Sequence, residues 1–160
     1  MASLLNLDRN ISYFTIIPAL ILPLSARYVS GLSGPGRKLF DKMNPRGHLE
    51  ALKTAKMDEE LRGRLLRAEA CCANGFEALP LFAAAVTAGN AAGVPARTMN
   101  LLSVGWIATR VAYTYVFIWY QGREKLAYNA VPLRTKVWLV GITTLMSMFV
   151  LAGLQQQGEK

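Results

Sequence analysis

Ionisable side chains lie near the middle of two long apolar segments in this 160-residue chain. Arg67, Glu69 and Glu77 lie in the first of these segments, and Arg110 lies in the second. A charge at the centre of a bilayer costs roughly 3 kcal/mol or more. Charged residues are therefore found there mainly where they face another charge, face water or take part in chemistry. The pattern predicts a membrane protein with a polar site between its helices.

Helical spacing gathers these side chains with other polar residues on shared faces. In the first segment, steps of three and four residues align Arg67, Asn74 and Glu77. In the second segment, the same spacing aligns Arg110 with Tyr113. Cations, a carboxylate, an amide and a phenol suit a small ligand that carries carboxylates, an ammonium group and amides.

A further cation stands at the start of the last apolar segment. Pro132 fits the first turn of a helix, and Arg134 and Thr135 follow it. We therefore expect three helices to present polar groups at one membrane depth, toward the cytoplasmic half. The plainer alternative is structural: Arg110 and Glu77 would form a buried pair that pins two helices, and the amide between them would join helices by hydrogen bonds.

Four apolar spans are expected to position these residues. The composition, 52% hydrophobic and 18% charged, is too apolar for a soluble domain, which has about 25% charged residues. Spans of about 20 residues are expected at residues 11–30, 65–88, 97–120 and 133–154. They predict an all-α, integral-membrane four-helix bundle that forms one domain over residues 1–160. Because a bundle of this size has a thin core, oligomerisation is expected.

Loop charges predict the orientation of the bundle. The net charge is +8, and most lysines and arginines lie in the loops at residues 31–64 and 121–132. Positive loops stay cytoplasmic, so both termini should face the lumen or the exterior. The membrane would be the endoplasmic reticulum of a eukaryote or the inner membrane of a bacterium. No zinc pattern or RNA-binding motif accompanies the basic charge, so nucleic acid is not an expected partner.

Membrane lipids are the expected partners of the loop cations and of the aromatic residues. Lysines and arginines beside the spans contact lipid headgroups, and tryptophans and tyrosines gather at membrane interfaces. The residues that partly mark these interfaces are Trp106, Trp119, Tyr120, Tyr128 and Trp138.

The first apolar segment has the length of a signal-peptide core, but its flanks differ. Asp8 cancels Arg9, so no positive region precedes the segment, and apolar residues continue to residue 32. The segment is therefore expected to be retained as a span, with Arg27 extending from its end to the lipid headgroups.

The cysteines and the histidine have ordinary expected roles. Cys71 and Cys72 are adjacent on a helix, so they are expected to be reduced packing residues. His48 is the only histidine and is expected to be a solvated loop residue. With no cluster of cysteine and histidine, no metal site is predicted.

These residues resemble the MAPEG family, the membrane-associated proteins in eicosanoid and glutathione metabolism. The family pattern of the second helix, R-A-x-x-x-x-x-N-x-x-E-x-x-P-x-F, is met by Arg67, Ala68, Asn74, Glu77, Pro80 and Phe82. An Asn-Pro pair before that helix, an R-x-x-Y pattern and a P-x-R-T pattern are met by Asn44-Pro45, Arg110–Tyr113 and Pro132–Thr135. The resemblance covers about residues 44–154 and is nearest to the bacterial and fungal branch.

The resemblance implies a homotrimer of four-helix bundles with glutathione in a cleft between neighbouring subunits. By position, Arg134 is the residue that holds the glutathione thiol as a thiolate, the nucleophilic form. The residues expected to bind the tripeptide are Arg67, Asn74, Glu77, Arg110, Tyr113 and Thr135. Arg37 or Lys38 would contact its carboxylates from the end of the first helix.

The expected function is that of a glutathione-dependent, glutathione S-transferase-like membrane enzyme: a transferase, peroxidase or isomerase acting on a lipophilic electrophile. Two departures from the family pattern, Ala70 and Phe117, each remove a polar group from the cleft. They favour an alternative, a non-catalytic lipid-binding or scaffold protein resembling the five-lipoxygenase-activating protein. A third reading is a glutathione-independent isomerase or cyclase of a biosynthetic pathway, with Glu77 or Tyr113 as acid or base.

Overall fold

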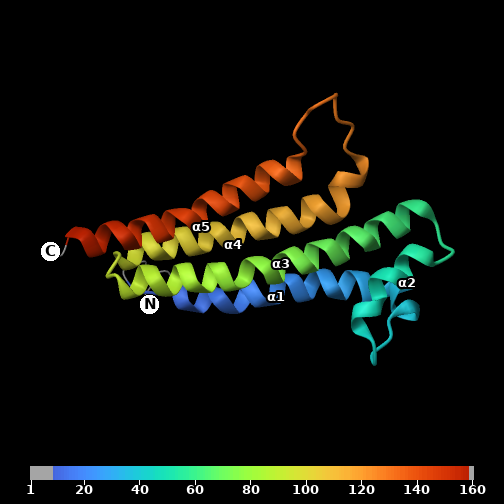
Figure 1. Ribbon diagram of the computed structural model, residues 1–160, viewed down its shortest axis with the longest axis horizontal. Helices are drawn as coiled ribbons and strands as arrows, with labels where there is room; N and C mark the ends of the chain where they lie inside the picture. Colours follow the sequence, from blue (N-terminus) through green and yellow to red (C-terminus); the bar gives the residue numbers. More distant parts are fainter. Residues whose placement is uncertain (1–8, 159–160) are drawn as a thin grey trace, which may run out of the picture.

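The computed structural model describes residues 9–158, and every element in this range is helical (Figure 1). Four helices are long and apolar enough to cross a membrane, which confirms the predicted all-α bundle. Asp8, which precedes the first apolar segment, lies outside the described residues. The elements in chain order are η1 (Ser12–Thr15), α1 (Ile16–Arg27), η2 (Tyr28–Leu32), η3 (Gly34–Leu39), η4 (Pro45–Gly47), α2 (His48–Thr54), α3 (Glu59–Ala91), α4 (Ala96–Tyr115), η5 (Val116–Tyr120), η6 (Gln121–Arg123) and α5 (Leu133–Gly158).

Helix α3 begins well before the expected span at residue 65. The side chain of Asp58 accepts a hydrogen bond from the Leu61 amide at 2.9 Å, and Glu59 and Glu60 occupy the first turn. A capping aspartate and acidic residues both stabilise a helix N-terminus. At 33 residues, α3 is about 50 Å long, so its first turns extend beyond a hydrocarbon core of about 30 Å.

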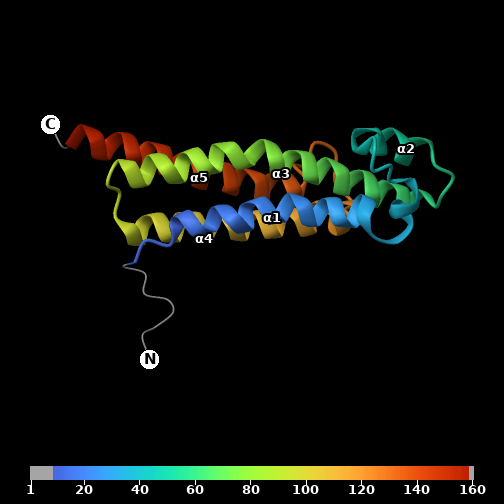
Figure 2. The same ribbon diagram turned by 90° about the horizontal axis from the view of Figure 1, so that it is seen from below.

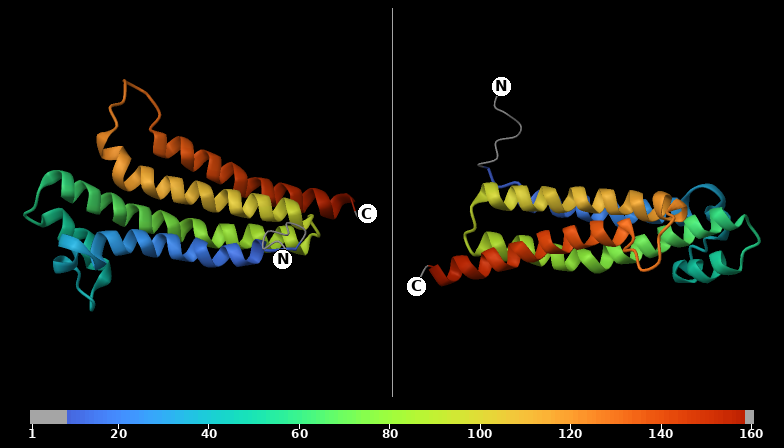
Figure 3. Two further views of the ribbon diagram at one scale, coloured as in Figure 1. Left: turned by 180° about the vertical axis from the view of Figure 1, so that it is seen from behind. Right: turned by 90° about the horizontal axis from the view of Figure 1, so that it is seen from above.

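The four long helices pack as two pairs, α1 with α3 and α4 with α5 (Figures 1 and 2). Helix α3 also packs on α5, so α1 and α5 lie on opposite sides of the bundle. The loop that contains α2 and the loop between η6 and α5 lie at the same end (Figure 3). The loops expected at residues 31–64 and 121–132 therefore lie at one end of the bundle. Helix α2 itself was not predicted.

Two apolar clusters fill the bundle, with polar side chains between them. The first lies toward the end without α2 and contains Phe82 and Trp106, whose rings stack with centroids 3.9 Å apart. The second lies toward the α2 end and contains Cys71, Cys72 and Tyr113. Both cysteines are free and buried, as predicted.

Helix α1 is an integral part of this core. Ala19 belongs to the first cluster and Ala26 to the second. A Cβ on Gly75 of α3 would lie 2.7 Å from the Cβ of Pro23, so the missing side chain permits the close approach of α1 and α3. The first apolar segment is therefore one of the four packed helices of the bundle.

At the end of the bundle away from α2, an asparagine cluster joins the segment before α1 to the neighbouring helices. The Ile11 amide donates to Asn100 Oδ1 at 2.8 Å, and Asn90 Nδ2 donates to Ser12 Oγ at 2.8 Å. Asn10 Nδ2 also donates to Asn90 Oδ1. These bonds join the segment before α1 to both α3 and α4.

Candidate functional site

An open cleft of about 240 Å³ lies where α3, α4 and the first turns of α5 meet. Its lining residues are Asn74, Tyr113, Arg134, Thr135 and Trp138. Four of these five were predicted from the sequence, and they come from three helices. Arg134 and Thr135 place the cleft at the start of α5, and Figure 1 shows that this end of α5 lies in the half of the bundle that carries the basic loops.

The first turn of α5 places Arg134 at this cleft. The backbone amide of Leu133 donates to Glu124 Oε1 at 2.9 Å, which fixes the start of the helix across the preceding loop. The Arg134 guanidinium lies over the Phe117 ring, with its central carbon 4.4 Å from the ring centroid. Within residues 9–158 it makes no hydrogen bond or ion pair. A half-buried guanidinium with unused donors is suited to an anionic ligand.

Arg110 lies inside the bundle, behind the cleft. Its guanidinium carbon is 4.9 Å from the Tyr113 ring centroid and 5.4 Å from that of Trp106, and Nη1 donates to Asn74 Oδ1 at 3.5 Å. The alternative that Arg110 pairs with Glu77 is wrong, because Glu77 is exposed and forms no ion pair within the described chain.

A narrow, partly open cavity of about 10 Å³ adjoins Arg110. Its lining includes Cys71, Asn74 and Tyr113. The buried Nε of Arg110 has no protein partner, and this volume is just sufficient for one water molecule. Asn74 and Tyr113 line both the cavity and the cleft, so they form the wall between the buried cation and the open site.

Gly141 of α5 makes room for the Arg110 guanidinium. A Cβ at this position would lie 2.5 Å from Arg110 Nη2 and 2.8 Å from Thr109 Oγ1. We expect Gly141→Ala to displace the guanidinium and to lower the free energy of unfolding by about 1–3 kcal/mol, the usual range for overpacking. Thermal unfolding of the detergent-purified protein would measure this loss.

Gly153→Ala provides the matched control on the same helix. A Cβ there meets no atom within 4 Å, so the gain in helix propensity should stabilise the protein by about 0.5–1 kcal/mol. Equal effects of the two alanines would show that Arg110 is not constrained by Gly141.

The remaining sequence-predicted residues do not line the cleft. Arg67 donates from Nε and Nη2 to the Ile118 carbonyl at 3.3 and 3.2 Å. Ile118 lies in the π-helical turn η5, which follows α4 directly. Glu77, Arg37 and Lys38 are exposed. The structure of a single chain therefore brings together Asn74, Tyr113, Arg134 and Thr135 of the predicted set, with Arg110 directly behind them.

Two side chains of the site have roles in the structure that differ from those predicted from the sequence. Trp138 was expected at a membrane interface but lines the cleft; its spacing of four residues from Arg134 places both on one helix face. Phe117 lacks the hydroxyl of the family's tyrosine, and its ring lies under the Arg134 guanidinium and supports it. Trp106, also expected at an interface, is buried in the core.

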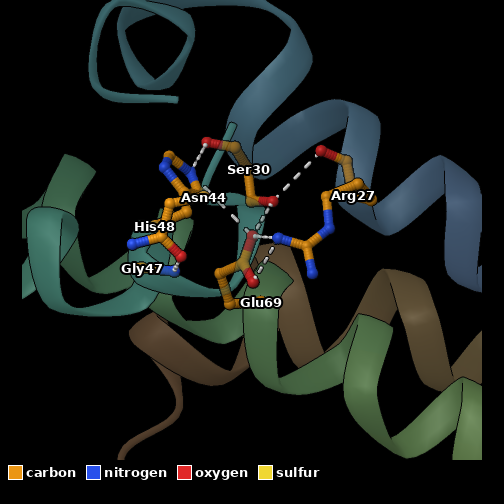
Figure 4. Close-up of polar contacts among 6 residues, drawn as sticks. All are labelled: Arg27, Ser30, Asn44, Gly47, His48 and Glu69. Atoms are coloured by element: carbon orange, nitrogen blue, oxygen red, sulfur yellow. Dashed lines mark hydrogen bonds and ion pairs between the residues drawn. The ribbon is translucent and has the colours of Figure 1, made fainter. Parts of the chain in front are cut away.

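A second polar cluster joins α1, η2, the start of α2 and α3 (Figure 4). Arg27 Nη1 donates to both carboxylate oxygens of Glu69 at 2.6 and 2.7 Å, and Ser30 Oγ donates to Glu69 Oε1. His48 Nε2 donates to the Ser30 carbonyl at 3.0 Å. The predictions that Arg27 reaches the headgroups and that His48 is solvated are therefore wrong: the first pairs with a buried carboxylate, and the second is itself buried.

A comparison with protein families matches residues 11–154 to the MAPEG family. Comparisons with curated proteins and with solved structures gave no match. The family match includes the four apolar helices, apart from the last turn of α5, and every residue that lines the cleft.

Proposed function

This chain belongs to the MAPEG family, and on that premise we propose that it is a membrane enzyme that uses glutathione as a co-substrate. With four apolar helices it is an integral membrane protein. The proposed reaction is conjugation, reduction or isomerisation of a lipophilic electrophile through a glutathione thiolate. The proposed location is the endoplasmic reticulum of a eukaryote or the inner membrane of a bacterium.

The unused guanidinium of Arg134 is the observation that supports this proposal most strongly. It lies in a cleft beside Asn74, Tyr113 and Thr135, which offer an amide and two hydroxyl groups to a peptide ligand. A cation beside a thiol favours the thiolate. The cleft lies toward the basic loops, so a water-soluble tripeptide can enter from that side while an apolar substrate enters from the bilayer.

In the proposed mechanism, Arg134 holds the thiolate sulfur and the polar wall of the cleft orients the tripeptide. The thiol releases its proton to water as the thiolate forms. The sulfur then attacks an electrophilic carbon or a peroxide oxygen: a new bond forms to sulfur, and the electron pair of the broken bond leaves with the departing atom, which takes a proton from water. With a peroxide, a second glutathione reduces the sulfenic acid formed on sulfur, which gives the disulfide and water. Because the chain's role is to position and stabilise charge, its contribution is mainly electrostatic. Arg110 supports the site from behind through Asn74.

A homotrimer is part of the proposal, because a single chain leaves the site incomplete. The cleft of about 240 Å³ is smaller than most small-molecule pockets, which measure about 300–1,000 Å³. Glu77 is exposed on a helix that crosses the apolar layer and has no partner within residues 9–158. Because an uncovered carboxylate at that depth is costly, a neighbouring subunit that covers it would stabilise the assembly and close the cleft.

Glutathione titration of the detergent-purified protein tests the proposal. At a glutathione concentration one hundred times the dissociation constant, binding should stabilise the protein by about 2.7 kcal/mol, seen as a higher thermal midpoint. An ultraviolet thiolate absorbance should rise with the same saturation curve. S-methylglutathione is the matched ligand: it should stabilise the protein without the absorbance.

Two outcomes of this titration would contradict the proposal. Stabilisation by both ligands with no thiolate signal would overturn the enzyme proposal in favour of non-catalytic binding. The absence of any shift at saturating glutathione would overturn the use of glutathione altogether.

A further inference from the structure

The loop at residues 124–132 is tied at its base and presents a tyrosine at its tip. The base is closed by the hydrogen bond from the Leu133 amide to Glu124 Oε1, at 2.9 Å. At the tip, the Ala130 amide donates to the Ala127 carbonyl at 3.0 Å, and Asn129 has φ 62°. Asparagine tolerates this left-handed conformation in tight turns. The turn leaves Tyr128 96% exposed.

The side chains on either side of the tip are apolar, and those on either side of Glu124 at the base are basic. Leu126 and Val131 are 47% and 48% exposed, and Arg123 and Lys125 are also exposed. The loop's one acidic residue is directed inward: Glu124 Oε1 accepts the Leu133 amide, and Oε2 is buried. The outer surface of the loop therefore combines an aromatic ring, aliphatic side chains and positive charge.

The loop begins at a belt of aromatic residues. Tyr115, Trp119 and Tyr120 are exposed on the last turns before it, and the rings of Tyr115 and Trp119 stack with centroids 5.9 Å apart. Exposed tyrosine and tryptophan at the end of a span mark the headgroup level of a bilayer. Figure 1 shows that the loop, drawn in orange, leaves the bundle sideways, across the helix axes rather than along them. Its path therefore runs over the membrane surface.

We propose that the loop at residues 124–132 is an interfacial anchor that binds anionic phospholipid headgroups of the surrounding membrane. Tyr128 lies at the boundary between headgroups and acyl chains, where its ring contacts hydrocarbon and its hydroxyl contacts water. Arg123 and Lys125 bind phosphate or carboxylate groups of anionic lipids, whose surface potential attracts basic segments beside a span. This inference does not depend on glutathione or on the cleft.

A fluorescent label on Tyr128→Cys tests the proposal in lipid nanodiscs. Cys71 and Cys72 are buried, so labelling of the unaltered chain gives the background. In nanodiscs that contain phosphatidylglycerol, we expect a blue-shifted emission, quenching by a nitroxide placed at headgroup depth, and protection from aqueous iodide. On this labelled background, Arg123→Glu with Lys125→Glu should raise the phosphatidylglycerol fraction needed for half-maximal quenching roughly tenfold or more.

The matched control carries the same charge change elsewhere at this end of the bundle. Lys53→Glu with Lys56→Glu alters two exposed lysines of the other basic loop and should leave the quenching curve unchanged. Iodide access without nitroxide quenching would overturn the proposal. Protection from both quenchers would also overturn it, because it would show that the loop packs on a second copy of the chain. Equal effects of the two charge reversals would show that only the net charge of the protein matters, and this outcome would contradict a lipid-binding site in this loop.

Discussion

Arg134→Ala is expected to lower kcat/KM for glutathione-dependent turnover by roughly a hundredfold to a thousandfold, the usual loss when one preorganised donor to a developing or fixed negative charge is removed. The guanidinium lies in the cleft with its donors unused and one face supported by Phe117. Without it, the thiolate absorbance should vanish, while glutathione should still bind through the other cleft residues. Steady-state kinetics and the thiolate absorbance of the same sample would measure both effects.

Lys136→Ala is the control for this substitution. Lys136 is an exposed cation on the same first turns of α5, but it does not line the cleft, so its removal should change turnover little. Arg134→Lys should recover only part of the activity, because an ammonium lacks the planar face that stacks on Phe117. Full activity of Arg134→Ala would remove this residue from the mechanism.

Glu69→Ala is expected to cause the largest loss of stability, about 3–5 kcal/mol, since removing one partner of a buried ion pair leaves the other charge uncompensated. Glu69 is 8% exposed and Arg27 is 28% exposed, and the carboxylate also accepts the Ser30 hydroxyl. Loss of the carboxylate would therefore leave the Arg27 guanidinium without its ion-pair partner, and the Ser30 hydroxyl would keep only its hydrogen bond to the Arg27 carbonyl at 3.1 Å. Thermal or denaturant unfolding in detergent would measure the change.

The ion pair between Glu50 and Lys53 provides the comparison. Its charged atoms are 2.7 Å apart, but the side chains are 71% and 51% exposed, so Glu50→Ala should cost less than about 1 kcal/mol. In contrast, Arg27→Met combined with Glu69→Leu should recover most of the stability lost in Glu69→Ala, because apolar replacement of a whole buried pair is often neutral. Equal losses from Glu69→Ala and Glu50→Ala would contradict the structural role assigned to the buried pair.

Periodicity and apolarity were sufficient to predict the four helices and most of the cleft. Helical spacing places Asn74 on its face of α3 and Tyr113 on its face of α4 whatever the neighbours are, and Pro132 marks the start of α5 close to Arg134. These are local properties of the chain, so the sequence contains them directly.

Partners that depend on how helices pack could not be predicted in the same way. Arg67 shares a helix face with Asn74, but its guanidinium reaches the Ile118 carbonyl because Gly122 has no side chain; a Cβ there would lie 2.6 Å from Arg67 Nη2. Likewise, Glu69 meets Arg27 across 42 residues of chain. Such pairs are set by the relative rotation and depth of two helices, which the pattern within one helix does not contain.

The separation of the core into two apolar clusters has a consequence for how this bundle can adapt to different membranes. The cluster around Phe82 and Trp106 lies away from the basic loops, and none of its residues lines the cleft. Mismatch between a span and the local bilayer thickness costs a fraction of a kcal/mol per Å. It is set by lipid-exposed side chains such as Val150 and Leu154 around this cluster, and substitutions there can relieve it without moving Arg134. Hydrophobic matching and the chemistry of the cleft are thus separable properties, open to independent change during evolution.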